Sequence, residues 1–405
     1  MPTTAAALGA PPSTTGIDTA SCAPDAHPHT GSCRLMAGTP GIAARPNTRT
    51  PRKAECRCWR FVRPEGLSGE TALTGVTAPS TRTAWAVGRD GTAPLAVHWT
   101  GSRWRRTPLP LPDRTVLGGI SAASANDAWI VGTSADGNAR TVHWNGRHWI
   151  PGALPASGGK PNSARGVAER APGDVWAVGS GNGFAGTMAV TWHFNGRAWT
   201  VTPTGSGPGS TLNAVAAHAH DDAWAVGTAG TRQLLLHWNG RSWAATTPPQ
   251  SAADATPSAV ATDSPNNAWV VGTTSAGASL VEHWDGGSWS VVPAPLPGSG
   301  RPAARARVPE AANGPTAAVT DGQDGVWISG ADTGSRPYLA HYNGTAWDIS
   351  RPPMPKAGSG RETSGVISAL ALVPGTQVIR AAGAFRAPGV TRSQALTWTN
   401  TPRPR

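Results

Sequence analysis

Short apolar stretches alternate with polar turns along most of the chain, and one block of this pattern recurs six times. Each copy has a Trp-x-Val-Gly segment or a close variant, then an apolar stretch ending in an aromatic residue, then a turn and a second Trp. Short runs bounded by turn residues predict β-strands rather than helices. The turn is most often Asn-Gly, which is the strongest short signal for a β-hairpin. The repeat therefore predicts sheets of short antiparallel strands.

The copies can be counted from the glycine that ends the Trp-x-Val-Gly segment. These glycines recur at intervals of 44 to 58 residues, at Gly88, Gly132, Gly179, Gly227, Gly272 and Gly330. A seventh, weaker copy contains Gly383, with Arg380 in place of the first Trp and Trp398 matched to the aromatic that ends the apolar stretch. Its missing second Trp is supplied by Trp59, near the other end of the chain.

These observations predict an all-β fold, a seven-bladed β-propeller of four-stranded antiparallel blades. The last blade would combine three C-terminal strands with one N-terminal strand, a 3+1 closure that leaves no open seam in the ring. Residues 59–400 give about 49 residues per blade, close to the roughly 40–50 residues of four-stranded propeller repeats.

Tryptophan is unusually abundant, with 19 Trp against 4 Phe and 2 Tyr. A residue copied at fixed positions of a repeat is expected to build the scaffold, and a buried Trp removes roughly 150–250 Å² from water. We therefore expect the tryptophans to pack between blades. The structural repeat positions are Trp59, Trp85, Trp99, Trp104, Trp129, Trp144, Trp149, Trp176, Trp199, Trp224, Trp238, Trp243, Trp269, Trp284, Trp289, Trp327, Trp347 and Trp398.

The N-terminal residues have a different composition from the repeats. Residues 1–52 are rich in Pro, Thr, Ala and Gly without periodicity, which predicts a disordered tail before a propeller over 53–402. The tail contains Cys22, His27, His29 and Cys33. They are weak metal candidates for zinc, because their spacing matches no standard site; a disulfide and free thiols are the other interpretations. We expect no cofactor.

The formal net charge of +11 raises the question of a nucleic-acid partner. Only three of the 34 Lys and Arg residues are Lys, a bias that GC-rich codon usage of a bacterial genome produces. The arginines are dispersed rather than gathered in one stripe, so we do not expect nucleic acid as a partner. No stretch approaches the ~18 apolar residues of a membrane span, and no signal peptide is visible. We expect a monomer.

The spacing of aromatic, polar turn, Trp and Pro-rich tail resembles the kelch motif of galactose-oxidase-like propellers, although kelch repeats usually carry a double glycine. Asp285-Gly286-Gly287-Ser288-Trp289 is also similar to turns of sialidase Asp-box repeats and of fucose-binding propeller lectins. The resemblance implies a propeller fold and is compatible with an extracellular or cell-surface location. Copper-radical chemistry of the galactose oxidase kind is disfavoured, because Tyr338 and Tyr342, the only tyrosines, fall in one repeat.

One histidine occupies the same strand position in each of six copies. Symmetry spaces these residues around the ring, so a repeated structural hydrogen bond is favoured over metal ligation. They are His98, His143, His193, His237, His283 and His341.

Function is expected where the copies differ. The connection between the fifth and sixth copies is longer than its equivalents and contains Arg301, Arg305, Arg307 and Glu310. We predict ligand binding there, as a basic lip over the central opening, against the alternative of a neutral surface insertion. The sequence shows no catalytic set. It favours a non-enzymatic binding module with a protein or glycan ligand. A carbohydrate-active hydrolase or lyase at the propeller mouth is one alternative, and a domain of a larger secreted or surface protein is another.

Overall fold

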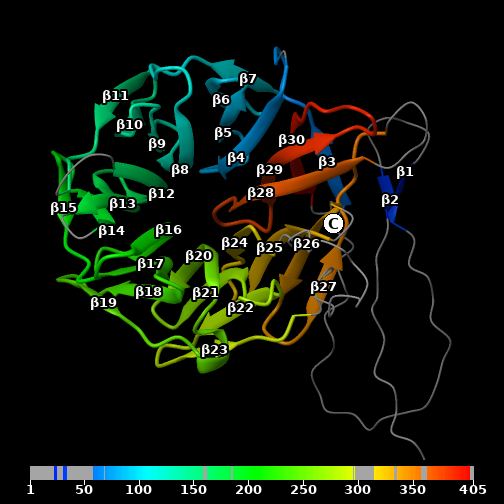
Figure 1. The fold of residues 1–405 in the computed structure, drawn as a ribbon. Coiled ribbons are helices and arrows are strands. Elements are labelled where there is room, and N and C mark those ends of the chain that lie inside the picture. Colours follow the sequence, from blue (N-terminus) through cyan, green and yellow to red (C-terminus); the bar gives the residue numbers. More distant parts are fainter. Residues whose placement is uncertain are drawn as a thin grey trace, which may run out of the picture.

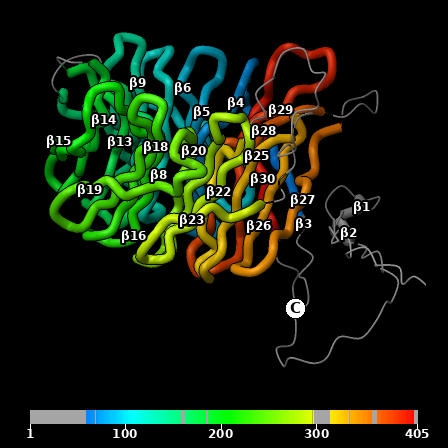
Figure 2. Tube along the Cα trace, turned by 60° about the horizontal axis from the view of Figure 1, so that its bottom comes forward, coloured from blue at the N-terminus to red at the C-terminus, as the bar shows by residue number. Residues whose placement is uncertain are grey.

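The computed structural model describes residues 58–401, except for 68, 158–161, 184–185, 295, 297–313, 333–334 and 357–362. Near the N-terminus it also gives the backbone of a separate strand pair, β1 (Cys22–Pro24) and β2 (Gly31–Cys33). In the described range, 28 strands form seven four-stranded antiparallel sheets arranged in a ring, as Figure 1 shows. Figure 2, turned by 60°, shows the same sheets standing side by side around the ring. The predicted seven-bladed propeller is confirmed.

Blades 1 to 6 follow one another along the chain, and in each the first strand is innermost. Blades 1 and 2 are β4 (Thr71–Thr77), β5 (Ala84–Asp90), β6 (Ala93–Trp99), β7 (Trp104–Thr107), β8 (Val116–Ser124), β9 (Asp127–Thr133), β10 (Ala139–Trp144) and β11 (Trp149–Ala153). Blades 3 and 4 are β12 (Asn162–Ala171), β13 (Asp174–Gly183), β14 (Gly186–Phe194), β15 (Trp199–Thr202), β16 (Ser210–Ala219), β17 (Asp222–Ala229), β18 (Arg232–Trp238) and β19 (Trp243–Ala245). A short 3-10 helix, η1 (Gln250–Ala252), precedes blade 5. Blades 5 and 6 are β20 (Thr256–Ser264), β21 (Asn267–Thr273), β22 (Ser279–Trp284), β23 (Trp289–Val291), β24 (Ala317–Thr320), β25 (Val326–Ala331), β26 (Pro337–Tyr342) and β27 (Trp347–Ser350).

Blade 7 closes the ring as predicted. Its strands are β28 (Ser364–Leu372), β29 (Ile379–Arg386), β30 (Gln394–Thr401) and β3 (Cys58–Val62). β3 pairs antiparallel with β30, with Trp59 opposite Asn400. In Figure 1 the blue β3 lies beside the red β30. The outermost strand of this blade therefore comes from the N-terminal side of the chain.

The register of blade 7 corrects one sequence alignment. Asn400, which faces Trp59, takes the place that Trp99 holds opposite Trp104 in blade 1. Trp398 therefore lies two residues earlier, at the position of Val97, because β30 continues beyond it to Thr401. Its indole N–H donates to the carbonyl of Pro353 at 2.9 Å, so this Trp packs inside the blade interface rather than at the hairpin.

The glycine of the Trp-x-Val-Gly segment does not end the second strand. β5 continues past Gly88 to Asp90. A Cβ on Gly88 would collide with the carbonyl oxygen of Ala72 on the first strand, and the glycine is required by this close approach of two backbones.

The core consists of layers between neighbouring blades. Trp85 of blade 1 packs against Trp144 and Trp149 of blade 2, with ring centroids 4.9 and 5.0 Å away. Trp176 packs in the same way against Trp238 and Trp243 of blade 4. Each blade thus covers an aromatic group of the preceding one, and the ring is stabilised by contacts between neighbours.

The contact between blades 7 and 1, where the ring closes, differs from the others. Arg380 of blade 7 replaces Trp, and its guanidinium carbon lies 4.8 Å from the ring centroid of Trp99 in blade 1. Its Nη2 donates to the carbonyl oxygen of Thr81 at 2.8 Å. Burial lowers the pKa of Arg380 to about 10, so it is still charged at neutral pH. A cation–π contact takes the place of the Trp–Trp contact where the ring closes.

Candidate functional site at the propeller mouth

The two faces of the ring are built from different connections. On one face, which we call the turn face, the hairpin between strands three and four contacts the turn between strands one and two. The indole N–H groups of Trp144, Trp238 and Trp284 donate across this contact to the carbonyls of Ala125, His220 and Pro265, at 3.1–3.2 Å.

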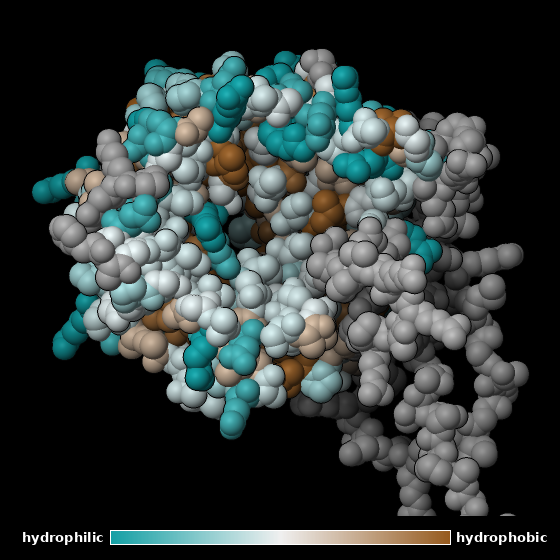
Figure 3. All heavy atoms as spheres, in the orientation of Figure 1, coloured by the Kyte–Doolittle hydropathy of each residue, from teal (hydrophilic) through white to brown (hydrophobic). Residues whose placement is uncertain are grey.

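The opposite face, which we call the mouth face, carries the connections between blades and the turns between strands two and three. There the amide of Asn162, at the start of blade 3, donates to the carbonyl of Gly137 in blade 2 at 3.0 Å. The corresponding contact between Arg114 and Thr92 is 2.7 Å long. Figure 3, which views the ring along its axis, shows that it is hollowed at the centre.

A repeated β-bulge lies on the innermost strand of the blades. In six blades the pairing of the first and second strands shifts by one residue at the same position of the first strand. In blade 6 the hydrogen bond from the amide of Thr316 to the carbonyl of Ser329 marks the equivalent position. A bulge adds an unpaired residue and re-aims its side chain. The seven bulge residues are Thr74, Gly118, Arg165, Asn213, Ser258, Thr316 and Ser368.

Three consecutive bulge side chains join one blade to the next. Each donates to the carbonyl that precedes the bulge residue of the following blade: Asn213 to Pro257 at 2.9 Å, Ser258 to Pro315 at 2.5 Å and Thr316 to Ile367 at 2.6 Å. These three bonds link the innermost strands of blades 4 to 7 beside the central opening.

Arg165 is the one charged member of the bulge ring. Its side chain is exposed, and its Nη1 donates to Oδ1 of Asn213 at 2.8 Å. The preceding blade has Gly118 at the equivalent position, where a Cβ would lie 2.6 Å from the carbonyl oxygen of Ala164. The missing side chain lets β8 approach β12 closely. The hydrogen bond to Asn213 holds the guanidinium of Arg165 at the central opening.

A cavity of about 430 Å³ surrounds Arg165 on the mouth face. It extends from the end of β9 in blade 2 across blade 3 to the start of β16 in blade 4. The lining residues are Thr133, Gly137, Asn162, Ser163, Arg165, Ser180, Gly181, Asn182, Thr187 and Thr211. These are hydroxyls, amides, glycines and one cation, a set that suits an anionic or polyhydroxylated ligand.

The six repeated histidines form structural contacts. In each repeat the imidazole packs on the Trp of the second strand, with ring centroids 4.0–4.4 Å apart. In four blades its Nε2 lies 2.7–2.8 Å from an Asp carboxylate, and His283 lies 3.1 Å from Asn267. These distances support the scaffold interpretation. The described residues contain no group of three or more His, Cys, Asp or Glu that could hold a metal ion.

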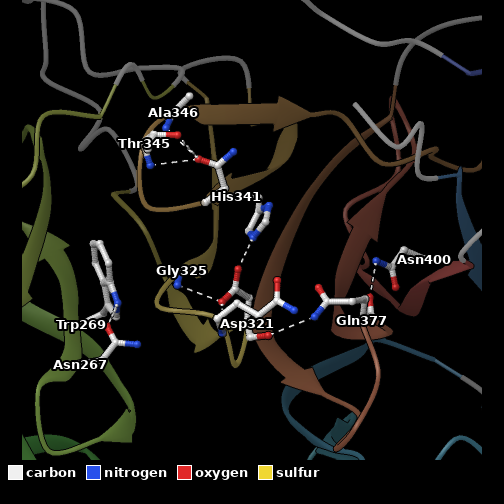
Figure 4. Close-up of polar contacts among 11 residues, drawn as sticks. Asn267, Trp269, Asp321, Gly325, His341, Thr345, Ala346, Gln377 and Asn400 are labelled. Carbon is white, nitrogen blue, oxygen red and sulfur yellow. Dashed lines mark hydrogen bonds and ion pairs between the residues drawn. The ribbon is translucent and has the colours of Figure 1, made fainter. Parts of the chain in front are cut away.

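Blade 6 forms this contact from a different place in the sequence. Gly325 stands where blades 2, 3 and 4 have Asp, and Asp321 reaches His341 from the end of the first strand, at 2.8 Å (Figure 4). Burial alone would raise the pKa of Asp321. The hydrogen bonds from His341 and from the backbone amides of Gln323 and Gly325 outweigh burial and lower that pKa.

Two buried carboxyl groups lie between blades. Glu169 accepts from the amide of Ala123 at 3.0 Å, and burial together with the neighbouring Asp127 raises its pKa well above the usual range. Glu282 accepts from Nε2 of Gln233 at 2.6 Å, and burial raises its pKa to about 7. Neither carboxyl lines the cavity at Arg165.

The structure does not describe the side chains of the residues predicted for function. Arg301, Arg305, Arg307 and Glu310 lie outside the described residues, as do His27, His29 and the side chains of Cys22 and Cys33. Within the described backbone, Cys22 and Cys33 are register partners of β1 and β2. Arg165 is not among the residues predicted for function from the sequence. An alignment of the innermost strands would have shown it as the only charged bulge residue.

Comparisons with known proteins show the fold. No family model matches the sequence, and no curated protein matches it. The structure is similar to YCF48 from Cyanidioschyzon merolae, with 12% identity, a TM-score of 0.52, and 86% of this chain and 100% of that chain covered. It is similar to a GH74 xyloglucanase from Xanthomonas campestris, with 18% identity, a TM-score of 0.54, and 84% and 55% covered. A chain of the mitotic checkpoint complex has 11% identity, a TM-score of 0.55, and 90% and 99% covered.

These similarities do not support the kelch resemblance beyond the level of the propeller. No helix in the described part of the chain is both long and apolar enough to cross a membrane. The chain is a seven-bladed β-propeller with a polar, singly charged cavity at its mouth.

Proposed function

We propose that the protein is a non-enzymatic binding module that takes an anionic group of a protein or glycan in the cavity around Arg165. The observation that carries the proposal is the lining of this cavity, which has one exposed cation and no carboxylate among its residues. A guanidinium held at a rigid opening by Asn213 suits a carboxylate, because such charge-assisted hydrogen bonds are stronger than neutral ones.

The same lining supports binding over catalysis. Glycoside hydrolysis needs two carboxyl groups on either side of the scissile bond, and the cavity supplies none. Among the structures similar in fold, one is described as YCF48 bound to a D1 peptide and another as a xyloglucanase. Because one fold serves both roles, the site and not the ring has to decide between them. Carbohydrate cleavage by this protein would therefore contradict the proposal.

The predicted basic lip belongs to the same proposal. Its connection rejoins the described chain at Gly314 beside Gly272 and Thr273 on the mouth face. We propose that Arg301, Arg305 and Arg307 add positive charge near the ligand, and that they modulate the association rate more than the affinity.

The test compares two arginines that differ in the face they occupy. Binders of residues 53–405 are selected from random dodecapeptides and from a glycan array. Their affinities are then measured for the Arg165→Ala and Arg147→Ala variants. Arg147 is an exposed residue of a hairpin on the turn face. We expect R165A to weaken binding about 10- to 100-fold, the value of one charge-assisted hydrogen bond, and R147A to bind like the unchanged protein.

Equal affinities of R165A and the unchanged protein would place the ligand elsewhere. Release of reducing sugar from an arrayed glycan would favour the enzyme instead.

A further inference from the structure

A second cavity adjoins the first on the mouth face. It has a volume of about 290 Å³ and lies toward the outer strands of blade 2. Its lining residues are Asn138, Ala139, Arg140, Ala153, Leu154, Ala156 and Asn162. Asn162 also lines the cavity around Arg165. The two cavities therefore share this residue.

The carboxamide of Asn162 is buried and incompletely paired. The residue is 5% exposed, and its Oδ1 has no hydrogen-bond partner among the described residues. Gly181 lies against this oxygen, where a Cβ would collide with it. A buried acceptor left without a donor costs about 1–3 kcal/mol, and this unfavourable term is removed when a donor on a ligand reaches the amide.

We propose that the two cavities and Asn162 form one groove, which leads from the central opening to the outer strands of blade 2 and holds an extended acidic segment of another polypeptide. In this arrangement an Asp or Glu side chain pairs with Arg165, and a backbone N–H of the same segment donates to Asn162. The following residues lie over Ala156 toward Arg140. The inference rests on the proposed function, since it extends the same site and names the partner.

The chemistry of the groove favours a polypeptide over a glycan. Neither cavity has an aromatic residue in its lining, so no flat apolar surface is available for a sugar ring. A side-chain amide pairs readily with a peptide group, because it offers one acceptor and two donors at short spacing. Arg140 is held 3.1 Å from Asp136, and this exposed ion pair is weak enough to exchange partners with an acidic ligand.

The test uses fluorescein-labelled oligo-glutamates of three and nine residues, with nine-residue oligo-lysine as the charge control. An extended strand advances about 3.3 Å per residue, so only the longer peptide can occupy both cavities. The Ala156→Trp variant fills the second cavity at an exposed position, and Ala198→Trp adds the same bulk at an exposed hairpin on the turn face. Asn162→Ala removes the unpaired amide, with its folding checked by thermal melting.

We expect nona-glutamate to bind the unchanged protein at least 10-fold more tightly than tri-glutamate. A156W should reduce this ratio to about one while leaving tri-glutamate unaffected, N162A should weaken nona-glutamate more than tri-glutamate, and A198W should change neither affinity. R165A should weaken both peptides.

Two results would overturn the inference and leave the proposed function standing. One is a length dependence that A156W does not change while R165A still weakens both peptides. The other is tighter binding of a nine-unit oligogalacturonate than of nona-glutamate, with the same response to R165A, which would identify an acidic glycan as the partner. Equal affinities of both peptides for R165A and for the unchanged protein would instead contradict the proposed function.

Discussion

Glu282 stands in a position that other blades fill with an apolar residue. It is fully buried, and its Oε1 has no hydrogen-bond partner in the described part of the chain. Oε1 of the adjacent Gln233 also lacks one. Burial raises the pKa of Glu282 from its ordinary value of 4.5 to about 7, so the folded protein binds the proton more tightly than the unfolded chain does. Its contribution to stability is therefore complete below pH 4.5 and declines as the pH rises through 7.

We predict that Glu282→Gln removes this pH dependence. The amide can accept from Gln233 and donate to its unpaired oxygen, so no charge is buried at alkaline pH. The variant should be more stable than the unchanged protein at pH 8.5, by an amount on the order of 3 kcal/mol, and similar to it at pH 4.5. Urea unfolding at both pH values measures the difference. Glu65→Gln, at an exposed position, is the control, and an equal gain at both pH values would contradict the explanation.

At the scale of single residues, the sequence reveals the scaffold better than the site. Trp and Asn-Gly are recognisable because they repeat. Arg165, in the proposed site, is the one charged residue at a bulge position that no shared residue type marks in the first strands. Trp398 was misaligned for a related reason, since a Trp can occupy the position of Val97 as well as that of Trp99. The unpaired oxygen of Asn162 depends on neighbours in three dimensions and has no sequence signal.

At the scale of elements, blade 1 lacks a hydrogen bond that blades 2 to 6 share. In those blades the histidine of the third strand bonds to an Asp or Asn side chain. Thr83 takes the position of Asp127, Asp174 and Asp222, two residues before the Trp. Nε2 of His98 is consequently buried without a hydrogen bond from any described residue. Burial lowers the pKa of this imidazole.

We predict that Thr83→Asp restores the contact of the other blades. A carboxylate beside His98 should raise the pKa of the imidazole toward or above its ordinary value and stabilise the protein by about 1 kcal/mol. An NMR titration of His98 and a thermal melt measure the two effects. Thr83→Asn, which supplies the hydrogen bond without the charge, should stabilise the fold with a smaller change in pKa. A lower melting temperature for both variants would contradict this explanation of the buried Nε2 of His98.

The blade pattern was predictable because hairpin turns, and the alternation of short apolar stretches with such turns, are local properties. The bulges were not, since a bulge residue can be Thr, Gly, Arg, Asn or Ser and has no composition of its own. The close approach of two backbones at Gly88, and its place within β5, depend on the neighbouring strand. Strand ends depend on pairing with neighbours, which the local pattern does not specify.

At the scale of the whole molecule, stability depends on closing the ring. β3 covers β30, and Thr397 donates to the carbonyl of Val62 across this pair at 2.9 Å. Trp59 also packs against Trp327 of blade 6, with ring centroids 6.0 Å apart. One short strand therefore completes a sheet and covers part of a blade interface.

We predict that a chain beginning at residue 64 exposes β30 as an unpaired edge and associates through it. It should melt at a lower temperature than a chain beginning at residue 53 and should form dimers or larger species in size-exclusion chromatography with light scattering. A synthetic peptide of residues 58–63 should restore the monomer when added in excess. A monomeric truncated chain with unchanged melting would show that the fourth strand of blade 7 is dispensable.

The same strand also determines when the protein can finish folding. During translation β3 leaves the ribosome before the six complete blades, and its partner β30 is made only after all of them. At about 5–20 residues per second, the roughly 340 residues between them take on the order of 20–70 s to synthesise. Throughout that interval the hydrogen-bonding edge of β3 has no native partner, and the indole of Trp59 has none until Trp327 of blade 6 has been made. The nascent chain therefore carries an unsatisfied strand throughout the synthesis of the six complete blades, and the ring cannot close until β30 has left the ribosome.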